Sequence, residues 1–150
     1  MKIVVLPVGK PKDKNIAQLA EMFIGRIIPK GLVEVEFVES ARDGNIEKEG
    51  ASILKRLRER DTVITLDEHG KMYDSVGFSD YISKSLSVIE GRLVFIIGGA
   101  FGLSHDVRKR ADEIISLSKM TFPHELCLLF LSEQLYRAFS IIAGNEYHHV

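Results

Sequence analysis

Apolar positions alternate between two periods along the chain. Short runs rich in Val, Ile and Leu are typical of β-strands. Between these runs, apolar residues recur three or four positions apart, which indicates amphipathic helices. We expect strands at residues 2–8, 32–38, 62–66, 93–97 and 113–117, and helices at residues 16–27, 45–60, 75–90, from 104 and 121–143. Regular alternation of strand and helix predicts an α/β fold with a mostly parallel sheet flanked by helices.

The run Leu93–Ile97 is the most continuous apolar strand, as expected for a strand buried on both faces of a parallel sheet. No linker, repeat or low-complexity segment interrupts the pattern. With 150 residues, of which 45% are hydrophobic and 27% charged, the chain is large enough for a core without disulfides. We therefore expect a single domain over residues 1–150.

Charge and cysteine content narrow the functional classes. The net charge of −1 provides no overall electrostatic footprint for nucleic acid, although residues 9–14 and 55–60 are locally basic. The single Cys127 cannot form an intramolecular disulfide. We see no signal peptide and no apolar run that approaches transmembrane length. These features predict a cytoplasmic protein without a membrane partner.

A glycine-rich segment, Gly98-Gly-Ala-Phe-Gly102, follows the most apolar strand and precedes a helix. Glycines at such a position let backbone N–H groups approach a ligand closely. A tight strand-to-helix turn is the simpler alternative. The glycine spacing differs from G-x-G-x-x-G, so a dinucleotide fingerprint is not expected.

The segment Leu117–Phe122 combines two hydroxyls and a thioether just before the last helix. Backbone groups and apolar walls of this kind suit an adenosine-like ligand. The simpler alternative is that Thr121 caps the helix.

Other polar residues have ordinary structural explanations. Glu133 and Arg137 are four positions apart on the last helix, the spacing of an ion pair. Asp67 and Glu68 end a strand and could do acid–base work, but such residues are usually solvated turn residues. No metal site is expected, because the spacing of the candidate ligands matches no standard zinc set; these are His124, Cys127, His148 and His149.

Four segments together resemble the ribosomal RNA large subunit methyltransferase H family, the 23S rRNA pseudouridine N3-methyltransferases of the SPOUT (trefoil-knot) class. They are Phe95-Ile-Ile-Gly-Gly-Ala-Phe-Gly-Leu103, Ser116-Leu-Ser-Lys-Met-Thr-Phe-Pro-His124, Glu133-Gln-Leu-Tyr-Arg-Ala138 and the terminal Tyr147-His148. The resemblance extends over the whole chain in length and order. The chain departs from it at Leu128, where members commonly have an arginine, and at His149-Val150, where many have a basic residue.

The resemblance implies an α/β domain with a C-terminal deep trefoil knot that works as a homodimer and uses S-adenosylmethionine. Its cofactor pocket would consist of Leu66, Gly98, Leu117, Ser118, Lys119, Met120, Thr121 and Phe122. Its substrate side would consist of His124, Arg137, Tyr147 and His148, close to the dimer interface. We expect the residues after Gly144 to be too few to fold over their own domain. The implied substrate is 23S rRNA in the assembled ribosome.

The implied reaction is an in-line displacement in which a ring nitrogen of the base takes the methyl group. His148 or His124 could accept the imide proton, because imidazole titrates near neutral pH. Arg137 could hold a phosphate or the deprotonated base, and Tyr147 could stack on a base. Two alternatives remain: a knotted methyltransferase for a different RNA position, and a non-enzymatic nucleotide-binding protein with its ligand at residues 98–102.

Overall fold

The computed structural model describes residues 2–149, and within them one five-stranded sheet forms the centre of the molecule. The strand order is β2-β1-β4-β3-β5, and every pairing is parallel. The predicted α/β class with a parallel sheet is therefore confirmed. The strands are β1 (Ile3–Pro7), β2 (Val33–Val35), β3 (Thr62–Met72), β4 (Leu93–Ile97) and β5 (Glu113–Ser116).

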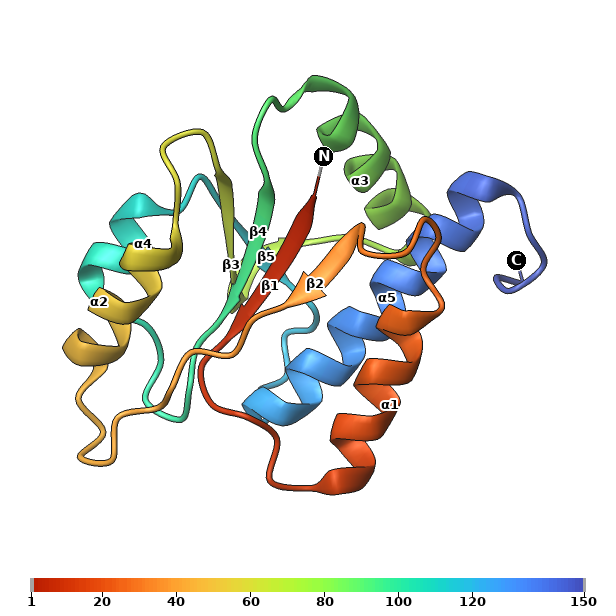
Figure 1. Ribbon diagram of the computed structural model, residues 1–150. Coiled ribbons are helices and arrows are strands. Elements are labelled where there is room, and N and C mark those ends of the chain that lie inside the picture. The colour runs from red at the N-terminus through yellow and green to blue at the C-terminus, as the bar shows by residue number, and fades with distance from the viewer. Residues whose placement is uncertain (1, 150) are drawn as a thin grey trace.

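Five helices cover both faces of this sheet (Figure 1). They are α1 (Lys14–Gly25), α2 (Ile46–Arg56), α3 (Ser75–Val88), α4 (His105–Arg110) and α5 (His124–Ala143). Alternate side chains of each strand point to opposite faces, so Val5 and Phe95 pack towards α1, α3 and α5. Their neighbours Val4 and Val94 pack towards α2 and α4. The sheet thus separates two hydrophobic clusters.

Local hydrogen bonds explain where two of the helices begin and end. Helix α3 begins at the predicted residue 75, and Asp74 caps it by accepting a hydrogen bond from the Gly77 N–H. The Ser75 hydroxyl instead donates to the Gln134 side chain on α5. Helix α2 ends at Arg56, before the predicted end at residue 60, because the Asp61 carboxylate holds the following turn through the Arg58 N–H.

Strand β3 runs six residues further than the predicted strand at 62–66. Its pairing with β5 is irregular: Leu66 and Lys71 both lie opposite Ile115, so the residues between them bulge out of the ladder. A Cβ atom on Gly70 would lie 2.7 Å from the backbone of Ile114, which explains the glycine in this bulge. Strand β3 is longer than predicted because it pairs with β5, and the local sequence pattern does not reveal pairing with a distant strand.

Helix α5 corrects the expectation that no apolar run approaches transmembrane length. Its 20 residues are long and apolar enough to cross a membrane by length and composition alone. The structure places it against α1 and α3 on one face of the sheet, with Leu131 and Leu135 buried. Leu128 is 2% exposed and belongs to the same core. The composition of α5 is therefore explained by its place in the core.

A buried ion pair joins the starts of β3 and β4. The Arg92 Nε and Nη2 atoms donate to the two oxygens of Asp61 over 2.9 and 2.6 Å, and the side chain of Asp61 is 1% exposed. Burial alone raises the pKa of Asp61. The hydrogen bonds from Arg92 and from the Arg58 N–H outweigh burial, so the pKa lies below its ordinary value.

We expect Asp61→Asn to lower the free energy of unfolding at pH 7 by about 3 kcal/mol, because it leaves a buried guanidinium without its counter-charge. Since the folded pKa of Asp61 is lowered, its ionised form stabilises the wild type above the unfolded value of about 3.9. That contribution is lost as the pH falls through the folded pKa. Urea unfolding at several pH values measures both effects. A pH-independent difference would show that packing, not charge, causes the loss.

Candidate functional site

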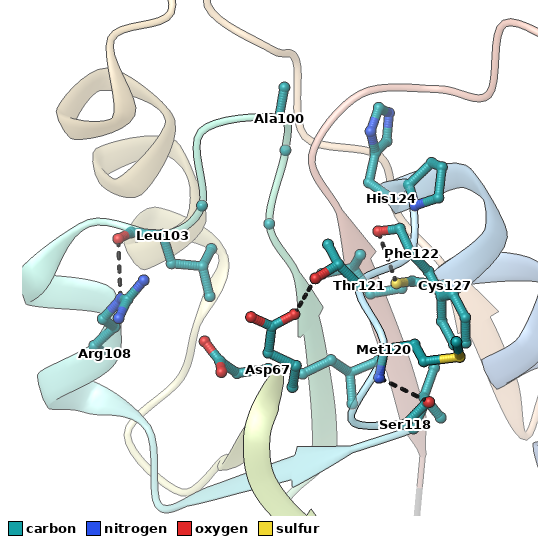
Figure 2. Close-up of a pocket in the computed structure, with 18 residues that line it drawn as sticks. Asp67, Ala100, Leu103, Arg108, Ser118, Met120, Thr121, Phe122, His124 and Cys127 are labelled. Atoms are coloured by element: carbon teal, nitrogen blue, oxygen red, sulfur yellow. Dashed lines mark hydrogen bonds between the residues drawn. The ribbon is translucent and has the colours of Figure 1, made fainter.

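A cavity of about 610 Å³ opens at the edge of the sheet where the carboxyl ends of the strands meet. Three segments form it: the bulge of β3, the loop between β4 and α4, and the segment between β5 and α5 (Figure 2). Ligands of parallel α/β proteins characteristically bind at this edge. The lining residues are 66–68, 97–100, 102, 103, 108, 117, 118, 120–124 and 127.

The glycine-rich loop forms one wall of this pocket. Gly102 has a φ of 83°, and its N–H donates to the Gly99 carbonyl over 3.1 Å, which closes a tight turn. A Cβ atom on Gly98 would lie 3.1 Å from the Leu103 side chain, closer than most real contacts. The segment therefore makes the predicted turn and also lines the pocket. Any larger residue at position 98 must push this wall out of place.

The segment before α5 forms the opposite wall. The Ser118 hydroxyl accepts the Met120 N–H over 3.0 Å, and its carbonyl accepts the Ser116 hydroxyl over 2.7 Å. The Thr121 hydroxyl donates to the Glu68 carboxylate across the pocket (Figure 2). The alternative in which Thr121 caps the helix is wrong, because Pro123 occupies the cap position of α5 without a side-chain hydrogen bond.

The two carboxylates of Asp67 and Glu68 line the pocket as well as being partly solvated, with side chains that are 32% and 37% exposed. Asp67 accepts the His69 backbone N–H over 2.8 Å and contacts the His69 ring nitrogen at 2.9 Å. The backbone hydrogen bond is the main reason that the pKa of Asp67 lies below its ordinary value. Asp67 therefore stays negatively charged at neutral pH inside a pocket with mostly apolar walls.

Most of the predicted cofactor residues lie together in this pocket. They are Leu66, Gly98, Leu117, Ser118, Met120, Thr121 and Phe122, and His124 of the predicted substrate side lies with them. Lys119 lies in a neighbouring hollow of about 400 Å³ with Glu68 and His69. The sequence analysis missed Arg108, which lines the pocket and donates to the Leu103 carbonyl over 3.2 Å. Within residues 2–149, no group of three or more His, Cys, Asp or Glu side chains is arranged to hold a metal ion.

The other predicted substrate residues form a second cluster, which we call the C-terminal cluster: Glu133, Arg137, Tyr147 and His148. One oxygen of Glu133 accepts from Arg137 Nε at 2.9 Å, from Arg137 Nη2 at 2.6 Å and from the Tyr147 hydroxyl at 2.9 Å. The Arg137 guanidinium also lies 4.7 Å from the centre of the Tyr147 ring. The hydrogen bond to Glu133 raises the pKa of Arg137, so the guanidinium stays charged. The expected ion pair therefore exists, and it also fixes Tyr147.

Arg137 also determines which nitrogen of the His148 ring carries the proton. Arg137 Nη1 lies 3.0 Å from His148 Nδ1. Because a guanidinium can only donate hydrogen bonds, Nδ1 must be the acceptor and the imidazole proton must lie on Nε2. His148 therefore presents an N–H donor, not a proton acceptor, on its remaining side.

The C-terminal cluster lies far from the pocket. His124 begins α5 and Arg137 follows 13 positions later, about 20 Å along the helix axis at 1.5 Å per residue. The expectation that the tail is too short to fold over its own domain is wrong. Gly144, with a φ of 74°, turns the chain. The ring of Tyr147 packs edge-on against that of Tyr136, with 4.6 Å between the ring centres. One copy of the chain does not bring all four predicted substrate residues together.

Comparison with known proteins gives a consistent result over nearly the whole chain. Residues 1–148 match the sequence model of a family described as a predicted SPOUT methyltransferase. The ribosomal RNA large subunit methyltransferase H of Acholeplasma laidlawii is 41% identical over 148 residues, which cover 99% of each chain. The protein of the same name from Porphyromonas gingivalis is 41% identical over 156 residues, again with 99% of each chain covered.

Solved structures with similar folds have little sequence in common with this chain. A probable methylase family protein from Haemophilus influenzae has a TM-score of 0.59 at 13% identity and covers 99% of this chain and 70% of its own. A probable methyltransferase from Bordetella pertussis also has a TM-score of 0.59, at 14% identity, and covers 92% of this chain and 95% of its own. At this identity the likeness concerns the fold alone.

We expect Glu133→Gln to release the C-terminal cluster, because the variant removes the charge that Arg137 and Tyr147 share. Hydrogen bonds to charged groups contribute about 1.5–3 kcal/mol, so amide exchange at residues 145–149 should accelerate roughly tenfold or more. Hydrogen exchange with mass spectrometry measures this on the C-terminal peptide. Glu146→Gln is the matched control, because the exposed Glu146 makes no ion pair with residues 2–149. Equal exchange in both variants would contradict the role of Glu133.

Proposed function

The chain belongs to the SPOUT methyltransferase family, and we propose that it methylates the RNA of the large ribosomal subunit, with S-adenosylmethionine as the methyl donor. We further propose that the target is N3 of a pseudouridine in 23S rRNA of the assembled ribosome, so that the enzyme works in the cytoplasm. The names of the relatives support the RNA and the subunit. The observation that carries the proposal is the pocket between the glycine-rich loop and residues 117–124.

The residues of this pocket fit the proposed cofactor. Bound S-adenosylmethionine would supply the methyl group from its positively charged sulfonium. Asp67 and Glu68 outnumber Arg108 among the charged side chains that line the pocket, so the lining suits a cationic ligand. Leu103 and Leu117 form apolar walls. Gly98 has no side chain, so a ligand can approach its backbone on this loop. The proposed cofactor residues are thus the predicted set together with the two carboxylates.

We assign removal of the proton to the pocket and stabilisation of the resulting negative charge to the C-terminal cluster. His124 lines the pocket, and we assign to it the removal of the imide proton from the base. Arg137 and the Nε2–H of His148 are hydrogen-bond donors, so they suit the negative charge that the base carries once the proton has left. Tyr147 holds Arg137 in place and offers a ring face for stacking.

Bringing these two places together requires a second copy of the chain. Within one copy, α5 holds His124 and Arg137 about 20 Å apart. In a two-fold symmetric dimer, the C-terminal cluster of one copy can approach the pocket of the other. Near the pocket, Met120 is 74% exposed and Phe130, which contacts Phe122, is 38% exposed. These apolar side chains offer a surface that a second copy would cover. We therefore propose a homodimer with shared sites.

The competing function, a nucleotide-binding protein without catalysis, is less compatible with this pocket. It would place a phosphate at residues 98–102. The N–H of Gly102 is already used by the Gly99 carbonyl, and the facing wall carries the carboxylates of Asp67 and Glu68. Negative charge on this wall opposes a phosphate and favours a cation.

We expect Gly98→Val to abolish binding of S-adenosylhomocysteine while unfolding remains cooperative. The new side chain would collide with Leu103 and displace the glycine-rich wall. Gly25→Ala is the matched control, because a Cβ atom there meets nothing within 4 Å. Titration calorimetry measures both affinities. Wild-type affinity in Gly98→Val would remove this pocket from the proposal.

Deleting residues 146–150 should abolish methyl transfer to ribosomes and leave S-adenosylhomocysteine affinity within a few-fold of wild type. The reason is that residues 146–149 do not line the pocket. Methyl transfer is followed with radiolabelled S-adenosylmethionine, and cofactor affinity by calorimetry. Full methylation by the truncated protein would return the chemistry to residues outside the tail.

Mixing two inactive proteins tests the shared site directly. His124→Ala damages only the pocket side, and the deletion damages only the tail. If each site combines both copies, re-equilibrated mixtures contain heterodimers with one intact site and should regain about a quarter of wild-type activity. A mixture that stays inactive, although light scattering shows dimers, would contradict shared sites.

A further inference from the structure

Three lysines, Lys10, Lys12 and Lys14, follow β1 at every second position and form what we call the lysine loop. All three are exposed. Because β1 is parallel to the other strands, this loop leaves the sheet at the same edge as the pocket (Figure 1). The proposed function assigns no role to these residues.

The backbone of the lysine loop is fixed next to the pocket. Gly9, with a φ of 83°, turns the chain, and its N–H donates to the Val38 carbonyl over 2.7 Å. A Cβ atom built on Gly9 would lie 3.8 Å from the Nε2 atom of His124. Further along, the Lys12 N–H donates over 2.8 Å to Glu125, the residue after His124. The loop therefore lies against the pocket residue to which we assign proton removal.

The three ammonium groups are free of carboxylate partners. Some of the other cations are paired, such as Lys2 with Glu34 at 2.7 Å and Lys48 with Asp43 at 3.2 Å. Within residues 2–149, no such ion pair involves a side chain of the lysine loop.

Two acids next to the lysine loop, Asp13 and Glu125, accept hydrogen bonds from backbone N–H groups instead. Counted against these two acids, the three lysines still leave a positive charge on the loop whose backbone lies against His124, on a chain with a net charge of −1.

The second basic segment of the sequence differs in place and in pairing. Residues 55–60 lie between α2 and β3, so they approach the opposite edge of the sheet from the pocket. Two of its arginines face acids, Arg56 at 3.8 Å from Glu36 and Arg60 at 3.3 Å from Glu90. Of the two basic segments, only the lysine loop lies at the edge of the sheet that holds the pocket.

We propose that the lysine loop binds the phosphates of the RNA strand that flanks the target nucleotide. This inference rests on the proposed function and adds to it the surface that docks the substrate backbone. Lysine ammonium groups neutralise phosphates and release their counterions, which makes binding depend on salt. Side chains that hold only the RNA backbone leave the base free to enter the pocket.

The test replaces all three lysines by glutamine and uses Lys55→Gln, Arg58→Gln and Arg60→Gln together as the control with equal charge change. For the lysine-loop variant, we expect the KM for ribosomes to rise roughly tenfold, and the slope of log affinity against log salt to become shallower by about 2. S-adenosylhomocysteine affinity should stay at the wild-type value in both triple variants. The variant with all three lysines replaced by arginine should keep wild-type KM.

Two results would overturn the inference: an unchanged KM and salt slope in the lysine-loop variant, or an equal loss in the control variant, which would indicate total charge alone. A wild-type protein that transfers no methyl group to ribosomes would refute the proposed function instead. In that case filter binding to ribosomal RNA still decides, because the salt slope of the lysine-loop variant is measured without catalysis.

Discussion

The parallel direction of all five strands is the constraint on which the rest of the structure depends. It brings the loops after β1 and β4 and the segment after β5 to one edge, although they are far apart in the sequence. Strand β4 is central in this arrangement, because it pairs with both β1 and β3 and all five of its residues are buried. A pocket can form at this edge because the side chains beneath it are immobilised in two cores.

Sequence periodicity predicted the elements because burial repeats with the geometry of strands and helices. The strand Leu93–Ile97 and the end of the last helix at residue 143 were predicted correctly for that reason. Contacts between distant segments were not predictable. Thr121 binds Glu68 across 53 positions, and β3 gains its last residues by pairing with β5. The pocket carboxylates were misjudged because nothing local distinguishes a solvated strand end from one that faces a cavity.

Helix α5 determines how the candidate chemistry is distributed. Its buried face, with Leu128, Leu131 and Leu135, fixes the helix against the sheet, so its two ends cannot move towards each other. His124 stays at the pocket, and Glu133 holds Arg137 and Tyr147 at the far end. The motifs that contain His124 and Arg137 are only 13 positions apart in the sequence. Because α5 joins them, they lie about 20 Å apart in space. The knot implied by the resemblance remains a prediction, since strand order alone does not describe how the chain is threaded.

The position of β1 in the sheet has a consequence for the kinetics of folding. Ile3 pairs with Leu93, so β1 cannot acquire its main partner until a very long loop has closed. Until then only the three residues of β2 can pair with it. Chains dominated by such non-local pairing fold slowly. During that interval the fully apolar strand Ile3–Leu6 is exposed to other chains, so newly made protein is most prone to aggregate before β4 docks.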